Sequence, residues 1–380
     1  MPYSGRNPHI FVVMMQHSGG GAEKQSIMVA EALKPTFEVT LVVAKPVPDD
    51  WQKSMEERGL SVAALQNRDT FLERRLRHRR LLTLCKNLKP DLVYSRWIKL
   101  NLALAKARDR GNLECRLIIQ VANTLSQLLG GHRVNRLLFE KKIYSHYPKA
   151  DLIICNGNEA RTDIVQEFGI KPDKCCYLPN LLAKESFPTY AEGVTGVRQN
   201  GPLRVVSAGR LIPQKDHSTL IKAVANVSGD IPLKVDIFGG GPQKNQLEKQ
   251  IKHLHLNDVV ALRASVTDVG KYFPEYDLFV SCSLYEGMSN VMLEAMAAGL
   301  PVVVTEVSGS RDVLTDPSQG VIFPPGDVDK LAGILKFLAL HRDRLTVFSR
   351  EGRKRAEDFT LAKLGKKYRE VFRSVLATRQ

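Results

Sequence analysis

Ten short apolar runs of four to seven residues alternate with helix-like stretches, and they constrain the fold more than any other feature. The first series lies at 10–15, 39–44, 91–95, 116–121 and 151–155; the second lies at 203–209, 233–239, 277–282, 301–304 and 320–323. Nearly continuous apolar strands separated by helices are typical of parallel sheets with both faces covered. Two such series predict an α/β protein with two doubly wound domains.

The segment "LLAKESFPTYAEGVTGVRQNGP" separates the two series and has scattered Gly and Pro with little periodicity. That composition is typical of an interdomain linker. The sequence therefore predicts an N-terminal domain over 1–182, a linker over 183–202 and a C-terminal domain over 203–358. A last helix over 359–380 carries its apolar residues on one face, so it must pack on another part of the chain.

The charge of the chain is strongly positive, at +15, and uneven. Residues 1–190 hold 29 Lys and Arg against 19 Asp and Glu, which favours an anionic partner such as a membrane surface, a nucleic acid or a phosphorylated substrate. No apolar run approaches the roughly 20 residues that cross a bilayer. Six cysteines without a CxxC spacing indicate neither a zinc site nor a disulfide scaffold, and we expect a cytoplasmic protein.

The stretch "YEGMSNVMLEAMAAGLPVVV" over 285–304 carries the chemistry. Glu286 is expected in a strand-to-helix loop and Glu294 one turn into the helix. Ligands of open α/β sheets bind at such loops, and the amides of a helix N-terminus suit a phosphate. Carboxylates there repel phosphate but accept hydrogen bonds from hydroxyls, so the combination fits a nucleotide sugar. The plainer alternative is a capped helix with two solvated acids. The amides in question belong to Gly287, Met288, Ser289 and Asn290.

The E-x7-E form of this stretch resembles that of retaining glycosyltransferases with the GT-B fold, and the wider string resembles glycosyltransferase family 4 (glycosyl transferases group 1). Five further segments resemble that family: "SGGGAEKQ" at 18–25, "LPN" at 178–180, "VVSAGRLIPQKDHSTLIKA" at 205–223, "DIFGGGPQKNQLE" at 236–248 and "GSRDVLTD" with the residues up to 327. The resemblance covers the C-terminal half more fully than the N-terminal half.

The resemblance implies two Rossmann-like domains facing across a cleft, with the C-terminal helix returning to the N-terminal domain. It also implies transfer of a sugar from a nucleoside-diphosphate donor with retention at the anomeric carbon. We expect a UDP-sugar, with an N-acetylhexosamine or another hexose as the sugar. The expected acceptor is a lipid-linked or cell-envelope glycan at the inner face of the cytoplasmic membrane.

The resemblance also implies roles for single residues. Arg210 and Lys215 would hold the diphosphate and stabilise the leaving group without a metal or other cofactor. Glu286 would bind and orient the sugar, and Glu294 would bind the ribose hydroxyls. Glycines of two tight turns would contact the donor, although such turns are also common for purely structural reasons. These glycines are Gly20 and Gly21 in the first domain and Gly239 and Gly240 in the second.

The chain departs from the family pattern at a few positions, such as Asp312 and Leu181, and most clearly at a missing histidine. Many members carry a His after the strand that here reads "LIIQVANT" over 117–124, and this chain has none. Asn123 is the nearest polar candidate on the acceptor side. His17 and His132 are alternatives, although a lone histidine is more often structural or solvated.

The run "ERRLRHRR" over 73–80 holds five arginines. We expect it to dock on anionic lipid, with a solvated helix face as the alternative. A nucleic-acid partner is not expected, because no aromatic residues interleave the basic ones. Two other functions stay open from the sequence: a nucleotide-sugar epimerase with the GT-B fold, and a non-enzymatic basic protein that binds membranes.

Overall fold

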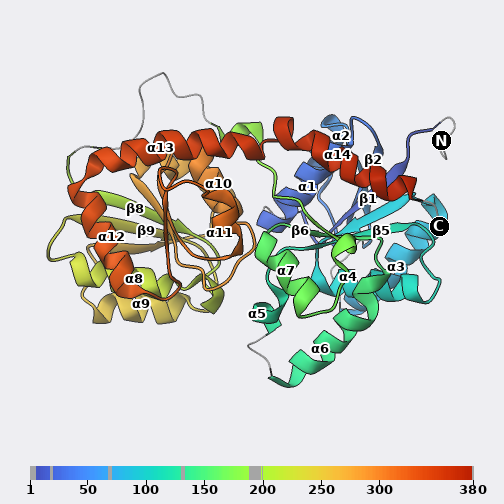
Figure 1. Ribbon diagram of the computed structural model, residues 1–380, viewed down its shortest axis with the longest axis horizontal. Helices are drawn as coiled ribbons and strands as arrows, with labels where there is room; N and C mark the ends of the chain where they lie inside the picture. The colour runs from blue at the N-terminus through green and yellow to red at the C-terminus, as the bar shows by residue number, and fades with distance from the viewer. Residues whose placement is uncertain are drawn as a thin grey trace. The chain divides into compact units, whose positions relative to one another are not determined.

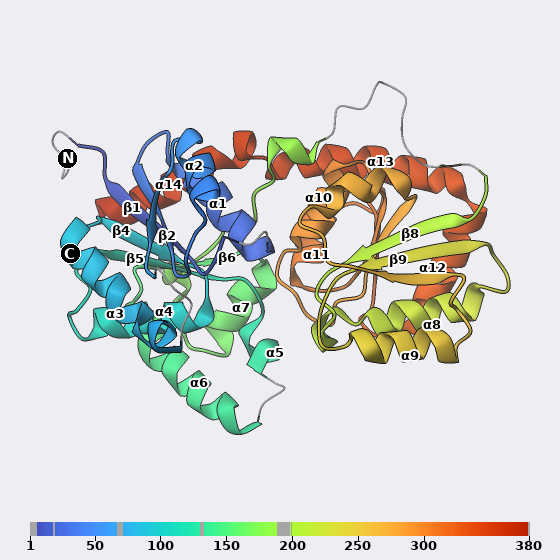
Figure 2. The same ribbon diagram turned by 180° about the vertical axis from the view of Figure 1, so that it is seen from behind.

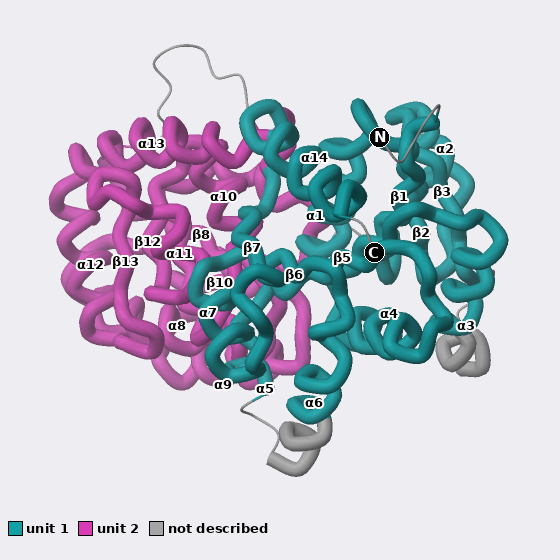
Figure 3. Tube along the Cα trace, turned by 45° about the vertical axis from the view of Figure 1, so that its right-hand side comes forward, with its two compact units in different colours: residues 1–181, 361–380 teal, residues 182–360 magenta. Residues whose placement is uncertain are grey.

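A computed structural model of the chain describes residues 6–17, 20–66, 71–129, 133–187, 198 and 200–378, with the backbone alone for 71–76 and 133–138. The chain divides into two compact units, of which one combines residues 1–181 with 361–380 and the other holds residues 182–360 (Figure 3). Most of the predicted linker lies outside the described residues. Among the helices that are described, none has the length and apolar character needed to span a membrane.

The first unit is built, within the described residues, around a seven-stranded sheet in the order β3-β2-β1-β4-β5-β6-β7. Neighbouring strands are parallel, so all of their carboxyl ends lie along one edge. The buried strand β1 pairs with β2 on one side and β4 on the other. The strands are β1 His9–Met14, β2 Glu38–Val43, β3 Ser61–Ala64, β4 Leu92–Ser95, β5 Arg116–Val121, β6 Leu152–Cys155 and β7 Cys175–Tyr177.

Helices cover both faces of this sheet (Figures 1 and 2). One layer contains α1 packed on α14, and the other contains α4 between α3 and α6. The apolar side chains that the strands and the second layer share form one continuous core. The helices are α1 Gly21–Leu33, α2 Asp49–Glu57, α3 Phe71–Leu88, α4 Ile98–Asp109, α5 Leu125–Leu129, α6 Arg133–His146, α7 Asn158–Gln166 and α14 Leu361–Ala377.

The last helix, α14, belongs to the first unit although it follows the second in the chain, as the expected return of the C-terminal helix requires. Tyr368 is buried on it and donates a hydrogen bond to the Pro179 carbonyl at 2.7 Å. Arg369 donates to the Ala32 carbonyl at the end of α1, at 3.0 Å. The single apolar face seen in the sequence therefore packs against α1 and the end of the first sheet.

The second unit has, among its described residues, a six-stranded parallel sheet in the order β10-β9-β8-β11-β12-β13. Strand order reverses between β8 and β11, which are neighbours in the sheet although β9 and β10 separate them in the chain. The strands are β8 Leu203–Ala208, β9 Leu233–Phe238, β10 Val260–Arg263, β11 Leu278–Ser281, β12 Val302–Thr305 and β13 Val321–Phe323.

Two helical layers enclose this sheet as well: α8 with α9 and α12 on one face, and α10 with α13 on the other (Figures 1 and 2). Their apolar sides and the strands between them form the core of the unit. The helices are α8 His217–Val227, α9 Lys244–His253, α10 Asn290–Ala297, α11 Ser308–Val313, α12 Val328–Leu340 and α13 Arg342–Ala356. The predicted fold class, two doubly wound Rossmann-like domains, is confirmed.

Candidate functional site

The candidate site lies in the second unit, at the carboxyl ends of β8 and β11. The strand order reverses between these two neighbouring strands, and each strand leads into a loop beside that point. Open α/β sheets bind their ligands at such a point. The loop after β8 holds Arg210 and Lys215, and the loop after β11 holds Glu286. The sheet topology thus gathers three predicted residues, widely spaced in sequence, at one edge.

Lys215 and Glu286 are in direct contact. Lys215 Nζ lies 2.5 Å from Glu286 Oε1, and the Ser283 hydroxyl donates to Glu286 Oε2 at 2.9 Å. The two charged side chains are 15% and 16% exposed, so this is not a solvated surface pair. Removing one partner of such a pair leaves the other charge partly buried without compensation. Arg210, by contrast, is exposed on the same loop.

The loop that carries Glu286 is held from two sides. Gln214 donates from its side-chain amide to the Tyr285 carbonyl at 2.9 Å, and its own carbonyl accepts from the Leu284 amide at 2.8 Å. On the other side, the Thr305 hydroxyl at the end of β12 donates to the Ser283 carbonyl at 2.6 Å. These bonds fix Glu286 before any ligand arrives, which is the preorganisation that electrostatic catalysis requires.

Helix α10 begins where the sequence predicted. The Ser289 hydroxyl caps it by accepting from the Met292 amide at 3.4 Å, and Gly299 ends it with φ +74°, the left-handed conformation that favours glycine. Glu294 is half-buried in the helix interior. Gly287 and Met288 precede the cap, and Met288 is buried.

A close backbone approach explains the glycine loop after β9. A Cβ on Gly239 would lie 2.0 Å from the Gly209 carbonyl oxygen, and one on Gly241 would lie 2.4 Å from the Leu211 carbonyl oxygen. Gly240 is different, since the nearest atom to its Cβ position is the Ser265 Cβ at 3.8 Å. Gly239 therefore has a packing reason to be glycine, and its donor contact stays a prediction. Helix α9 begins at Lys244, two residues after Pro242.

His217 is a residue of this site that the sequence reasoning missed. It opens α8 and is 2% exposed, and its Nε2 is buried without a hydrogen-bond partner among the described residues. Burial, and then the nearby Lys215 cation, lower the pKa of His217 to about 4, so the ring is neutral at pH 7. Its position directly after "KD" was the only sequence signal.

We expect His217 to make folding stability depend on pH. The unfolded chain takes up a proton near pH 6.5 and the folded chain only near 4, so stability falls as pH drops between these values. The two pKa values imply a loss of about 3 kcal/mol below pH 4. Thermal unfolding of the wild type and His217→Gln at pH 7 and 4.5 measures this. Equal losses in both proteins would contradict it.

The predicted residues of the first unit lie at the carboxyl edge of its own sheet. Gly20 precedes α1 as its N-cap and Gly21 opens that helix, and both are exposed after β1. His17 packs its ring against Trp51, with centroids 6.0 Å apart. Asn123 follows β5 and is half-buried. His132 lies outside the described residues.

Two models of known protein families match the chain, and the segments that they match correspond closely to its two units. Residues 19–182 match the family model described as Glycosyltransferase Family 4, and residues 196–355 match Glycosyl transferases group 1. The chain is also 30% identical, over 91% of its length and 94% of the relative's, to the N-acetylgalactosamine-N,N'-diacetylbacillosaminyl-diphospho-undecaprenol 4-alpha-N-acetylgalactosaminyltransferase of Campylobacter jejuni.

The chain belongs to glycosyltransferase family 4. A second relative is the UDP-Gal:alpha-D-GlcNAc-diphosphoundecaprenol alpha-1,3-galactosyltransferase of Escherichia coli, 26% identical over 48% of this chain and 50% of that protein. Among solved structures, Anabaena HepE in complex with UDP-glucose superimposes with a TM-score of 0.80 at 19% identity, covering 97% of this glycosyltransferase and 100% of HepE. Sucrose-phosphate synthase from Thermosynechococcus elongatus gives a TM-score of 0.80 at 16% identity, covering 98% of this chain and 100% of the synthase. These structures confirm the GT-B fold.

Proposed function

We propose that this glycosyltransferase moves a hexose or N-acetylhexosamine from a UDP-sugar to a lipid-linked glycan, with retention at the anomeric carbon. The observation that carries the proposal is the Lys215–Glu286 pair at the strand-order reversal of the second unit. It sets a cation suited to a diphosphate beside a carboxylate suited to sugar hydroxyls. The names of the Campylobacter and Escherichia coli relatives, both of which specify diphospho-undecaprenol substrates, support the acceptor class.

Different residues of the site would bind different parts of the donor. Lys215, with the exposed Arg210, would neutralise the charge that develops on the departing diphosphate. Glu286 would accept hydrogen bonds from the sugar, with Ser283 holding its second oxygen at 2.9 Å. Glu294 would accept from the ribose hydroxyls. The amides that precede α10 and the glycines Gly20, Gly21 and Gly240 would contact the rest of the donor.

Retention is proposed to use the donor itself. An oxygen of the leaving diphosphate would accept the acceptor's proton on the face from which the leaving group departs. The new bond then forms on that same face, which retains the configuration. Lys215 and Arg210 would stabilise the same oxygens, so no protein nucleophile enters this scheme.

We expect the reaction to proceed without a metal, because two cations, Lys215 and Arg210, would supply the charge that a divalent ion supplies elsewhere. Activity should survive an excess of EDTA with little change in turnover. The assay is UDP release at saturating donor with and without EDTA, followed by addition of Mg²⁺. Loss of activity that Mg²⁺ restores would contradict this expectation.

The basic segment 73–80 in α3 remains our candidate for docking on anionic lipid. Two of its arginines contact the residues that follow β3: Arg77 donates to the Gln66 side chain at 3.3 Å, and Arg80 donates to the Leu65 carbonyl at 3.0 Å. Arg79 is exposed. The side chains of Arg74 and Arg75 lie outside the described residues.

Replacing Arg74, Arg75 and Arg79 by glutamine is expected to weaken binding to anionic vesicles on the order of 100-fold, at about 1 kcal/mol per arginine. Sedimentation with phosphatidylglycerol vesicles measures it, and raised salt should weaken wild-type binding as well. The matched control replaces three exposed cations of the second unit: Lys249, Lys252 and Arg350. If both triple variants pellet like the wild type, α3 is not the anchor.

The proposed function is tested by screening nucleotide sugars for thermal stabilisation and then measuring nucleotide release with undecaprenyl-diphosphate-linked acceptors. A glycosyltransferase releases UDP only when donor and acceptor are both present. An epimerase would convert the nucleotide sugar with no acceptor, and a non-enzymatic membrane protein would release nothing. Either of these outcomes would replace the proposal.

A further inference from the structure

The first sheet also reverses its strand order, and a buried cation follows one of the two strands at that point. Strands β1 and β4 are neighbours in the sheet, although β2 and β3 separate them in the chain. Arg96 directly follows β4 and is 8% exposed. Because open α/β sheets bind ligands where the strand order reverses, Arg96 has the position of a ligand-binding residue in the first unit.

The Arg96 guanidinium lacks the partner that a buried arginine usually has. Its Nη1 is buried without a hydrogen-bond partner among the described residues, and no ion pair joins it to a described carboxylate. Arg342 is equally buried, at 8% exposure, but donates to the Asp277 carboxylate at 3.4 Å and to the Gly201 carbonyl at 3.2 Å. A buried charge without a partner is costly, so Arg96 points to an anion that binds there.

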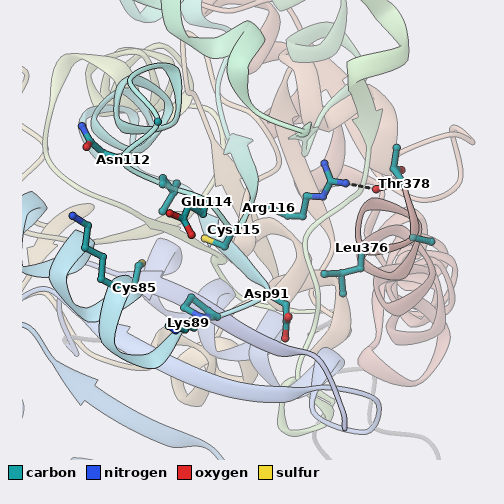
Figure 4. Close-up of a pocket in the computed structure, with 14 residues that line it drawn as sticks. Cys85, Lys89, Asp91, Asn112, Glu114, Cys115, Arg116, Leu376 and Thr378 are labelled. Atoms are coloured by element: carbon teal, nitrogen blue, oxygen red, sulfur yellow. Dashed lines mark hydrogen bonds between the residues drawn. The ribbon is translucent and has the colours of Figure 1, made fainter. Parts of the chain in front are cut away.

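Arg116 gives the same contrast within the first sheet. It lies at the amino edge, on the wall of a cavity of about 740 Å³ (Figure 4). Its guanidinium donates to the Asp151 carboxylate at 2.8 Å and to the Thr378 carbonyl. The arginine at the amino edge is therefore paired, whereas Arg96 at the carboxyl edge is not.

A second donor without a partner lies on the strand next to Arg96. In the ladder between β4 and β5, Ser95 pairs with Ile119. The same register, continued by one residue, sets Arg96 opposite Gln120. The Gln120 Oε1 accepts from the Tyr94 hydroxyl, but its Nε2 is buried without a partner among the described residues. Tyr94 and Arg96 are two residues apart, so they point to the same face of the sheet, and two unpaired donors occupy neighbouring positions on that face.

Two donors, one of them a cation, suit the oxygens of a phosphate group. The planar guanidinium forms charge-assisted hydrogen bonds and can donate to two oxygens of one phosphate. In the proposed reaction the donor's diphosphate already has Lys215 and Arg210 in the second unit. The diphosphate of a lipid-linked acceptor still lacks a binding residue.

We propose that Arg96 and Gln120 bind a phosphate group of the acceptor's diphosphate at the carboxyl edge of the first sheet. The inference rests on the proposed function, because a lipid-linked acceptor supplies that group. Such a site selects an acceptor by its diphosphate as well as by its sugars. A glycan without the diphosphate should therefore be a much poorer acceptor than the same glycan with it.

The first experiment titrates pyrophosphate into the full-length protein while UDP saturates the donor site. We expect the wild type to bind pyrophosphate and Arg96→Met to bind it roughly 10- to 100-fold more weakly, because charge-assisted hydrogen bonds are lost. Arg116→Met is the matched control and should bind it like the wild type. No binding by the wild type would overturn the proposal. Equal losses of UDP and pyrophosphate affinity in Arg96→Met would assign Arg96 to the donor instead.

Melting temperatures separate a binding role from a structural one. Arg96→Met removes a buried charge that has no partner, so without ligand it should melt at or above the wild-type temperature, whereas Arg116→Met should melt lower. Gln120→Glu supplies a carboxylate opposite Arg96, and it should raise the melting temperature and abolish pyrophosphate binding. If Arg96→Met does not fold, Gln120→Glu decides, since pyrophosphate binding that survives this change would contradict the site. A lower melting temperature of Arg96→Met with unchanged pyrophosphate affinity would show a structural role.

Kinetics then connect the site to the acceptor. In Arg96→Met, the KM for an undecaprenyl-diphosphate-linked acceptor should rise roughly 10- to 100-fold, while the KM for the UDP-sugar stays the same. An unchanged acceptor KM, with normal transfer by the wild type, would overturn this inference and leave the proposed function intact. If the wild type transfers no sugar although its pyrophosphate binding depends on Arg96, the proposed function and the acceptor assignment fail together, and a phosphate site remains.

Discussion

Replacing Lys215 by methionine is expected to lower turnover roughly 100- to 1,000-fold, the usual effect of losing one preorganised group that stabilises developing charge. Methionine keeps an unbranched side chain packed against Gly209. A Cβ atom added to Gly209 would lie 3.4 Å from two methylene carbons of Lys215. The packing is therefore largely kept while the charge is lost. Turnover at saturating donor and acceptor measures the effect, and Arg210→Ala added to Lys215→Met should lower it further.

Two controls separate catalysis from stability. Lys222→Met removes an exposed lysine from α8, close in sequence, and should leave turnover unchanged. Lys215→Met leaves Glu286 without its cation and should lower the melting temperature, whereas Lys215→Met/Glu286→Gln removes both charges and should recover part of it. Normal turnover in the Arg210→Ala/Lys215→Met variant would end the assignment of these cations.

Replacing Glu294 by alanine is expected to weaken UDP binding by about 1.5–3 kcal/mol, because a hydrogen bond to a charged acceptor is lost. This corresponds to roughly 10- to 150-fold in the dissociation constant. Alanine is the best helix former, so α10 should persist. Isothermal titration with UDP measures the change.

Pyrophosphate is the control ligand for Glu294, since it has the diphosphate but no ribose. Its affinity should be the same for Glu294→Ala and the wild type. Glu248→Gln on α9 is the matched control variant. The Glu248 carboxylate is exposed, so its loss should change the affinity for neither UDP nor pyrophosphate. Unchanged UDP affinity in a folded Glu294→Ala protein would refute the ribose role, and equal losses for both ligands would indicate a role in shaping the site instead.

The fold could be predicted because its central strands are buried on both faces and read as apolar runs. All ten predicted strands are present, and the three that were missed are β3, β7 and β10, each at the edge of its sheet. An edge strand has a neighbouring strand on one side only and is less buried, so its sequence is less continuously apolar. In β3 no residue is fully buried, and β7 has only three residues, of which one is buried.

The positions of the candidate site residues could be predicted only where a general rule about α/β sheets applies. The rule that ligands bind at the carboxyl ends of strands placed Arg210, Lys215 and Glu286 at one edge. The sequence alone could not show that Lys215 contacts Glu286, because this contact requires β8 and β11 to be neighbours in the sheet. The packing role of Gly239 and the buried position of His217 likewise follow from contacts between separate loops, which no spacing within one segment reveals.

We propose that the second unit binds a UDP-sugar through the Lys215–Glu286 site and that the protein transfers the sugar. The most direct measurement is transfer of a labelled sugar from its UDP donor to an undecaprenyl-diphosphate-linked acceptor, by wild type and by Lys215→Met, with the product's anomeric configuration read by NMR. We expect the wild type to form product only when the acceptor is present, with the donor's configuration, and the variant to form it roughly 100- to 1,000-fold more slowly. Product with inverted configuration, or equal rates from both proteins, would contradict it.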